Sequence, residues 1–99
     1  MYVSCTRVKT SDQPIENATI VAEEMHRWFR DMEGFKGFLM LSREGTTLSI
    51  TFWESSEVAE RSRAPRDQFR SRITTVAGVE VEEVADYRLM FGQLPPLGA

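Results

Sequence analysis

The sequence has very few of the residues on which metal and disulfide sites depend. Its 99 residues include one cysteine and one histidine. A single thiol permits no internal disulfide and no paired-cysteine metal motif, and one imidazole cannot build a multi-histidine metal site. We therefore expect no metal site, and we interpret Cys5 as a buried structural thiol in a cytoplasmic protein.

Long apolar runs and an excess of positive charge are also missing. No segment approaches the roughly 20 consecutive apolar residues that cross a bilayer, and no N-terminal segment has the pattern of a secretory leader. The formal net charge is −3, which gives no general attraction to nucleic acid. We therefore expect neither a membrane nor a nucleic acid as a partner. A chain of this length corresponds to one small domain whose core is limited, so self-association is expected.

The spacing of apolar residues predicts four strands. Alternation of apolar and polar residues predicts strands at 2–8, 47–53 and 79–91, the last with a bulge near Glu82 and Glu83. A short and nearly continuous apolar run predicts a strand at 38–43. The turn Glu44-Gly45-Thr46 would join two of these strands as a hairpin.

Apolar positions three and four residues apart predict a helix at 15–32. A second helix is expected between the third and fourth strands, and Pro65 should divide it because proline removes a backbone donor. The signals for helix starts are Asp12 and Pro14 for the first helix and Ser55 or Ser56 for the second.

The order strand, helix, strand, strand, helix, strand predicts a single α+β domain over residues 1–92, with an extended tail at 93–99. The expected fold is ferredoxin-like βαββαβ, in which a four-stranded antiparallel sheet carries two helices on one face. Such a sheet has a second, uncovered face. A second copy of the chain packed sheet to sheet would cover that face, so we expect a homodimer.

Two segments carry a family resemblance. Residues 34–38, GFKGF, and residues 50–55, ITFWES, resemble the GFxG and WES blocks of the antibiotic biosynthesis monooxygenase-like group in the dimeric α/β-barrel superfamily. The block order is similar from about residue 2 to residue 91. The resemblance implies that Trp53, with Ser49 and Thr51, lines a pocket between sheet and helices. It also implies a dimer barrel built from the opposite face, through Leu48, Ile50 and Phe52 and through Tyr87, Leu89 and Phe91 of the last strand.

The resemblance implies cofactor-independent oxygenation of a small planar aromatic metabolite of the polyketide or quinol type. Two positions depart from the pattern of the polyketide oxygenases, since Ser49 stands in the place of an asparagine and Ala59 in the place of a tyrosine. A protein that binds such a metabolite without turnover, and a cyclase or isomerase, therefore remain alternatives. Haem degradation is not expected, because the haem-degrading relatives use a histidine on the second helix and an asparagine on the first strand, where this chain has Ala64-Pro65 and Thr6.

The second predicted helix is rich in arginine, and one guanidinium could stabilise a phenolate or enolate at the pocket mouth. Arg72 lies close to the position of a helical arginine in related oxygenases. The alternative is a solvated basic face that pairs with Glu80, Glu82 and Glu83. His26 lies about 100° from the apolar stripe of the first helix, which favours a surface position over a general base. The candidate catalytic residues are thus Trp53, Ser49 and Arg72, and the candidate substrate contacts are Thr51, Thr6, Phe29, Phe69 and His26.

Overall fold

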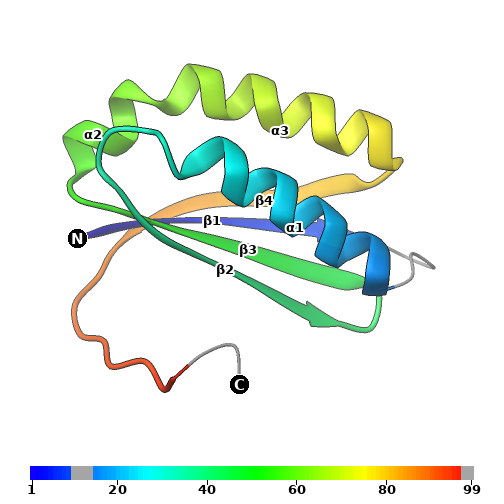
Figure 1. Ribbon diagram of the computed structural model, residues 1–99, viewed down its shortest axis with the longest axis horizontal. Coiled ribbons are helices and arrows are strands. Elements are labelled where there is room, and N and C mark those ends of the chain that lie inside the picture. Colours follow the sequence, from blue (N-terminus) through cyan, green and yellow to red (C-terminus); the bar gives the residue numbers. More distant parts are fainter. Residues whose placement is uncertain (10–14, 97–99) are drawn as a thin grey trace.

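The computed structural model describes residues 1–9 and 15–96, which form one sheet and three helices (Figure 1). The four strands pair antiparallel in the order β2-β3-β1-β4. All helices lie on one face of the sheet, and the C-terminal segment leaves on the opposite side (Figure 1). The predicted α+β, ferredoxin-like fold is therefore confirmed. The elements in chain order are β1 (Tyr2–Lys9), α1 (Ile15–Phe29), β2 (Phe35–Arg43), β3 (Thr46–Trp53), α2 (Ser56–Arg61), α3 (Arg63–Ala77) and β4 (Glu80–Arg88).

Three predicted element ends differ from the structure by three residues, and the other predicted strand ends agree within one residue. α1 ends at Phe29 rather than at residue 32, and the chain then turns through Gly34, whose φ is 77°. β2 begins at Phe35 rather than at residue 38, because Phe35 already pairs with Trp53. β4 ends at Arg88 rather than at residue 91, since its partner strand β1 begins at Tyr2, opposite Arg88. The predicted helix-start residues Asp12 and Pro14 lie outside the described residues.

The second predicted helix is divided, but the division precedes Pro65. α2 ends before Ser62, and α3 has Pro65 as its third residue. An unbroken helix would require Pro65 to donate to the carbonyl of Arg61, and proline has no N–H and crowds that carbonyl. The predicted N-cap is confirmed at Ser55, whose Oγ accepts a hydrogen bond from the Val58 amide at 3.3 Å.

The strand register assigns side chains to the two faces of the sheet. Residues that are directly opposite in an antiparallel pair share a face. On β3 the side chains of Thr47, Ser49, Thr51 and Trp53 are all buried beneath the helices, whereas Leu48, Ile50 and Phe52 are half-buried on the other face. The predicted bulge is confirmed in the pairing of β1 with β4, where Arg7 faces Glu83 and Val8 faces Val81, so that Glu82 is the extra residue.

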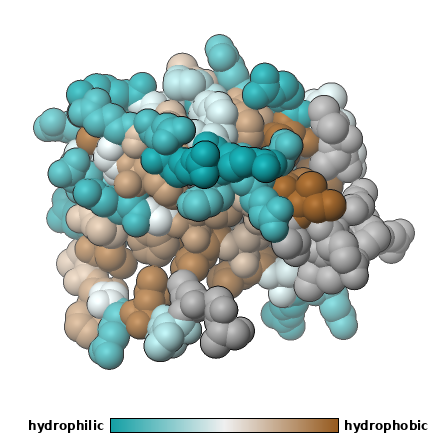
Figure 2. Space-filling view, viewed as in Figure 1, coloured by the Kyte–Doolittle hydropathy of each residue, from teal (hydrophilic) through white to brown (hydrophobic). Residues whose placement is uncertain are grey.

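The uncovered face of the sheet carries a large apolar patch, with charged residues at one end. Leu41 and Tyr87 lie on it with exposed fractions of 50% and 54%, and the following segment exposes Met90, Phe91 and Leu94. Figure 2 shows hydrophobic side chains gathered below the polar outer surface of the helices.

Within the described residues, no helix is long and apolar enough to cross a membrane.

The turn between α1 and β2 supplies a test of this packing. At Gly34, an added Cβ would lie 2.3 Å from Cγ1 of the buried Val58, and the positive φ adds conformational strain. We expect Gly34→Ala to lower the free energy of unfolding by roughly 3 kcal/mol. Gly45→Ala is the matched control, because Gly45 has a φ of 71° but no atom within 4 Å of the new Cβ. It should cost only about 1 kcal/mol. Urea unfolding measures both, and equal losses would contradict the packing at Gly34.

Candidate functional site

Hydroxyl side chains line the helix-covered face of the two central strands. Ser4 pairs with Thr51 and Thr6 pairs with Ser49 across β1 and β3, and Thr47 continues the column on β3. Four of the five residues are buried, and Thr6 is half-buried. An ordinary helix-covered sheet face would be apolar. The structure therefore brings the predicted residues Ser49, Thr51 and Thr6 together on one polar floor.

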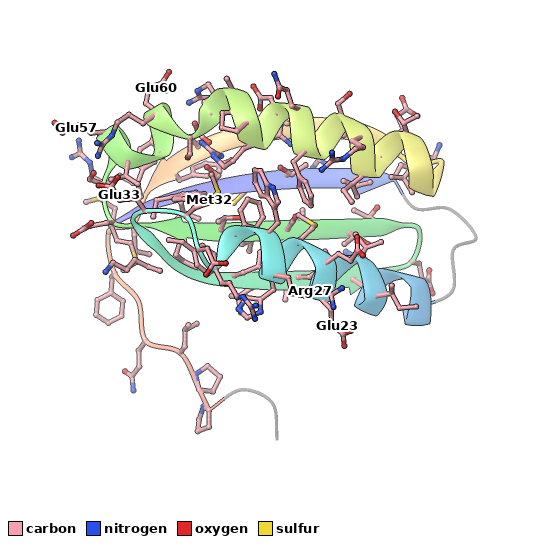
Figure 3. All side chains as sticks on the ribbon, turned by 45° about the horizontal axis from the view of Figure 1, so that its top comes forward. Glu23, Arg27, Met32, Glu33, Glu57 and Glu60 are labelled. Carbon is pink, nitrogen blue, oxygen red and sulfur yellow. The ribbon has the colours of Figure 1, made fainter. Side chains whose placement is uncertain are left out.

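An aromatic cluster closes one end of this floor around Trp53. The Trp53 side chain has an exposed fraction of 0% and is the largest fully buried side chain of the described residues. Its ring meets Phe29 and Phe35 edge-on, at centroid separations of 6.0 and 6.1 Å, and Ala59 and Val58 of α2 complete the cluster. Such edge-to-face contacts are favourable for aromatic rings. Side chains from the helices and from the sheet point into the layer between them, while Glu57 and Glu60 project outward from α2 (Figure 3).

The indole nitrogen of Trp53 is a buried donor without a partner in the described part of the chain. No described residue accepts a hydrogen bond from Trp53 Nε1. Oδ1 of Asp86 is likewise buried, and no described residue donates a hydrogen bond to it. A buried polar group left unpaired destabilises a fold by about 1–3 kcal/mol. Trp53 thus carries a polar group that its packing against the described residues does not use.

Arg66 lies directly beside Trp53, and the sequence did not single it out. Its guanidinium carbon is 4.9 Å from the centroid of the Trp53 ring, a cation–π arrangement, and the residue is 5% exposed. Burial lowers the pKa of the Arg66 guanidinium. Helical spacing could have indicated this burial. Residues 62, 66 and 69 are four and three residues apart, so they share one helix face, and all three are buried.

The other arginines of this region pair at the surface. Arg63 donates to Asp86 Oδ2 at 2.6 Å, and this hydrogen bond, with a further one to Glu60, raises the pKa of Arg63. The expected pairing with Glu80, Glu82 and Glu83 is wrong for the described part of the chain. Glu80 and Glu83 lie opposite Lys9 and Arg7 on the uncovered face, and Glu83 binds Arg7 at 2.9 Å. The observed ion pairs of the arginines are Arg61 with Glu33, Arg63 with Asp86 and Glu60, and Arg70 with Asp67.

Arg72, Phe69 and Trp28 form a stack at the seam between α1 and α3. The rings of Trp28 and Phe69 lie parallel at 4.3 Å, and the guanidinium carbon of Arg72 is 5.5 Å from the centroid of the Phe69 ring. Phe69 also contacts Phe29, so the stack continues into the Trp53 cluster. Arg72 itself is exposed and borders an open depression of about 550 Å³ along α3, together with Asp67, Gln68, Ser71 and Thr75.

His26 and Cys5 lie away from the polar floor. His26 is exposed on α1, as the helical spacing indicated, and its ring centroid is 6.2 Å from that of Phe35. Cys5 is half-buried on the uncovered face of the sheet, opposite Ile50 and Ala85, so the expectation of a fully buried thiol is wrong. Burial and then the charges of Asp86 and Glu83 raise the pKa of the Cys5 thiol. In residues 1–9 and 15–96, no group of three or more acidic, histidine or cysteine side chains could hold a metal ion.

No family model and no curated protein matches the sequence, but solved structures do. A candidate antibiotic biosynthesis monooxygenase from Deinococcus radiodurans is 16% identical, with a TM-score of 0.71 over 99% of this chain and 100% of its own. A variant of SnoaB, a cofactor-independent oxygenase from Streptomyces nogalater, has a TM-score of 0.66 at 16% identity, over 96% of this chain and 98% of its own. The monooxygenase ActVA-Orf6 of Streptomyces coelicolor, in complex with nanaomycin D, has a TM-score of 0.60 at 16% identity, over 96% of this chain and 92% of its own.

Similarity at this level of identity establishes the fold. It covers nearly the whole of this chain and of each of these structures. The GFKGF segment forms the turn and the start of β2, and the ITFWES segment forms the end of β3 and the N-cap of α2, so both lie around the Trp53 cluster. The chain has the fold of the antibiotic biosynthesis monooxygenase-like proteins, as those two segments indicated.

Proposed function

We propose that this protein is a cofactor-independent monooxygenase of a small planar aromatic metabolite of the polyketide or quinol type, bound between the sheet and the helices. The observation that carries the proposal is the buried indole N–H of Trp53, which has no acceptor among the described residues. A carbonyl or phenolic oxygen of a ligand would accept this hydrogen bond. The names of the similar structures, an oxygenase and two monooxygenases, also support the proposal.

The side chains around Trp53 suit a flat ligand that carries oxygen substituents. Phe29 and Phe69 offer aromatic walls, and the hydroxyls of Ser49 and Thr51 offer hydrogen bonds to ring oxygens. Ser49 and Trp53 are four residues apart on one strand, which corresponds to about 13 Å. That distance matches a ligand of several fused rings that lies along β3, with an oxygen near each end. Thr6 and Ser49 then meet one end, and Trp53 meets the other.

The proposed reaction draws its electrons from the substrate. Loss of a proton from an anthrone or a hydroquinone gives an electron-rich carbanion, which reduces O₂. One oxygen atom enters the ring, so that the CH₂ of an anthrone becomes a carbonyl or a hydroquinone becomes a hydroxyquinone, and the second oxygen atom leaves as water with the two hydrogens that are lost. The protein would bind and orient the ring system and exclude water from it. Arg72, at the outer end of the stack that begins at Trp28, would stabilise the ionised oxygen at the pocket mouth. His26 is exposed and would contact only a ligand that reaches past Phe35.

Binding without turnover is a second candidate function, and one position favours it. Ala59 has an exposed fraction of 0% and packs in the Trp53 cluster, so the place of the tyrosine in the polyketide oxygenases holds no proton donor. A binding protein needs the aromatic walls and the polar floor but no acid or base. A cyclase or isomerase would likewise convert the ligand without taking up oxygen.

We also propose that the uncovered face of the sheet packs against that of a second copy. Leu48, Ile50 and Phe52 are only half-buried in one protomer, and Tyr87 lies on the same face. An apolar face of this kind is normally covered in a soluble protein. A dimer with two-fold symmetry would bury the same residues of both copies.

Oxygen consumption tests the proposed reaction. Given a panel of anthrones and polycyclic hydroquinones, the purified protein should take up O₂ faster than the spontaneous reaction, and product mass should rise by the exchange of two hydrogens for one oxygen. Trp53→Phe and Ser49→Ala should each lower the rate roughly tenfold or more, since each removes a positioned hydrogen-bond donor. Ser56→Ala is the control, because Ser56 is exposed at the start of α2.

The alternatives give different results in the same experiment. Saturable quenching of tryptophan fluorescence with an unchanged ligand would establish a binding protein. A product of unchanged mass would establish an isomerase or cyclase. If no member of the panel reacts or binds, the proposed site is wrong.

Light scattering tests the dimer. At micromolar concentration the protein should have about twice the chain mass of 11.4 kDa. Ile50→Lys should give a monomer with an unchanged circular dichroism spectrum, because the new charge faces water in the monomer but would be buried in the dimer. Gln68→Lys, which makes the same charge change on the exposed side of α3, should remain dimeric. A wild-type protein that scatters as a monomer would contradict the proposal.

A further inference from the structure

Arg66 is a buried cation whose hydrogen bonds within the described residues go only to neutral oxygens. Its Nε donates to Ser62 Oγ at 3.0 Å, one terminal nitrogen donates to Ser4 Oγ at 3.1 Å, and the other donates to the carbonyl of Ala59 at 2.6 Å. A guanidinium has five N–H groups. These three bonds use one N–H on each nitrogen, so each terminal nitrogen has a second N–H in addition.

The charge of Arg66 has no ion-pair partner in the described part of the chain. Asp86 is the carboxylate that most raises the pKa of Arg66, but its Oδ2 binds Arg63 at 2.6 Å. No carboxylate oxygen of residues 1–9 or 15–96 forms an ion pair with the Arg66 guanidinium within 4.0 Å. Arginine is almost never fully buried unless it is paired. Removing a charge from water without a counter-ion costs several kcal/mol. The other arginines of α3 that form ion pairs do so nearer the surface.

Trp53 adds a second donor beside Arg66. The Arg66 guanidinium lies over the Trp53 ring, and the buried indole N–H of that ring has no acceptor among the described residues. Two neighbouring groups thus offer hydrogen bonds and one of them offers a full positive charge. An anionic oxygen would satisfy both groups, whereas a neutral or cationic group would leave the buried charge uncompensated.

We propose that Arg66 and Trp53 form a subsite for an ionised oxygen of the aromatic ligand, a carboxylate or a phenolate. This inference rests on the proposed function, because it assigns the ligand's charge and orientation within the same pocket. It makes Arg66, rather than the exposed Arg72, the residue that selects anionic ligands. The Ser4 and Ser62 hydroxyls hold the guanidinium in place, so they are positioning groups for this subsite.

A pair of probes of equal shape tests the subsite directly. Anthraquinone-2-carboxylate and its neutral carboxamide differ mainly in charge, and their binding is measured by quenching of the protein's tryptophan fluorescence. We expect the carboxylate to bind at least about tenfold more tightly than the amide, which corresponds to about 1.4 kcal/mol. Arg66→Gln should abolish this preference and Arg66→Lys should retain part of it. Arg70→Gln, the same charge change at a surface ion pair, should leave the preference intact.

A hydroxyanthraquinone separates the phenolate from the carboxylate. Its absorbance reports ionisation of the phenol, and bound to the wild-type protein it should ionise at a lower pH than in water, by about one pH unit for a tenfold preference. Arg66→Gln should remove this shift. Tight binding of the carboxylate with no shift of the phenol would assign the subsite to carboxylates alone.

The outcomes distinguish this inference from the proposed function. If both anthraquinone probes bind equally to the wild-type protein, or if Arg66→Gln keeps the preference, the anionic subsite is wrong while the aromatic pocket stands. If neither probe binds, the pocket itself is wrong. The comparison of probes on the wild-type protein needs no variant, so it remains decisive even if Arg66→Gln fails to fold.

Discussion

The burial of Trp53 at the meeting point of sheet and helices is the constraint on which the rest of the structure depends. Its ring packs against Phe29 of α1, Phe35 of β2 and Val58 of α2, so one side chain joins three elements. Gly34 belongs to the same arrangement, because any Cβ there would displace Val58. The carbonyl of Gly34 accepts the Glu54 amide at 2.8 Å, which fixes the turn against the end of β3. The aromatic packing and the tight turn therefore stabilise each other.

The layer between helices and sheet departs from the usual apolar packing. Buried polar groups occupy positions where aliphatic side chains would need no desolvation of a polar group. They are the hydroxyls of Ser4, Thr47, Ser49 and Thr51 and the guanidinium of Arg66. Polar groups in such a layer reduce stability unless they are fully bonded, and the Trp53 N–H has no acceptor among the described residues. The proposed ligand would bond to these groups. The apolar residues, in turn, gather on the uncovered face, where a second copy would supply the missing cover.

Local signals in the sequence were enough for the fold and for part of the site. Alternation along β3 is sufficient to separate its hydroxyls and Trp53 from Leu48, Ile50 and Phe52, because side chains on a strand point to opposite faces in turn. The Ser55 cap and the bulge at Glu82 followed from short-range chemistry. The ends of α1, β2 and β4 did not, because each depends on where a partner strand begins or on the tight approach of Gly34 to Val58.

The roles of the arginines also depend partly on the sequence and partly on tertiary contacts. The sequence by itself determined the order of elements, the faces of the strands and a helix rich in arginine, since these depend on spacing along the chain. Only the tertiary structure decided that Arg66 is buried over Trp53 and bonded to Ser4, 62 residues away, while Arg72 stacks on the outer side of Phe69. A charged residue on a helix is exposed by default, and it becomes buried only when a neighbouring strand provides its hydrogen-bond partners. That pairing is a property of the folded sheet, and it sets the charge of the proposed site.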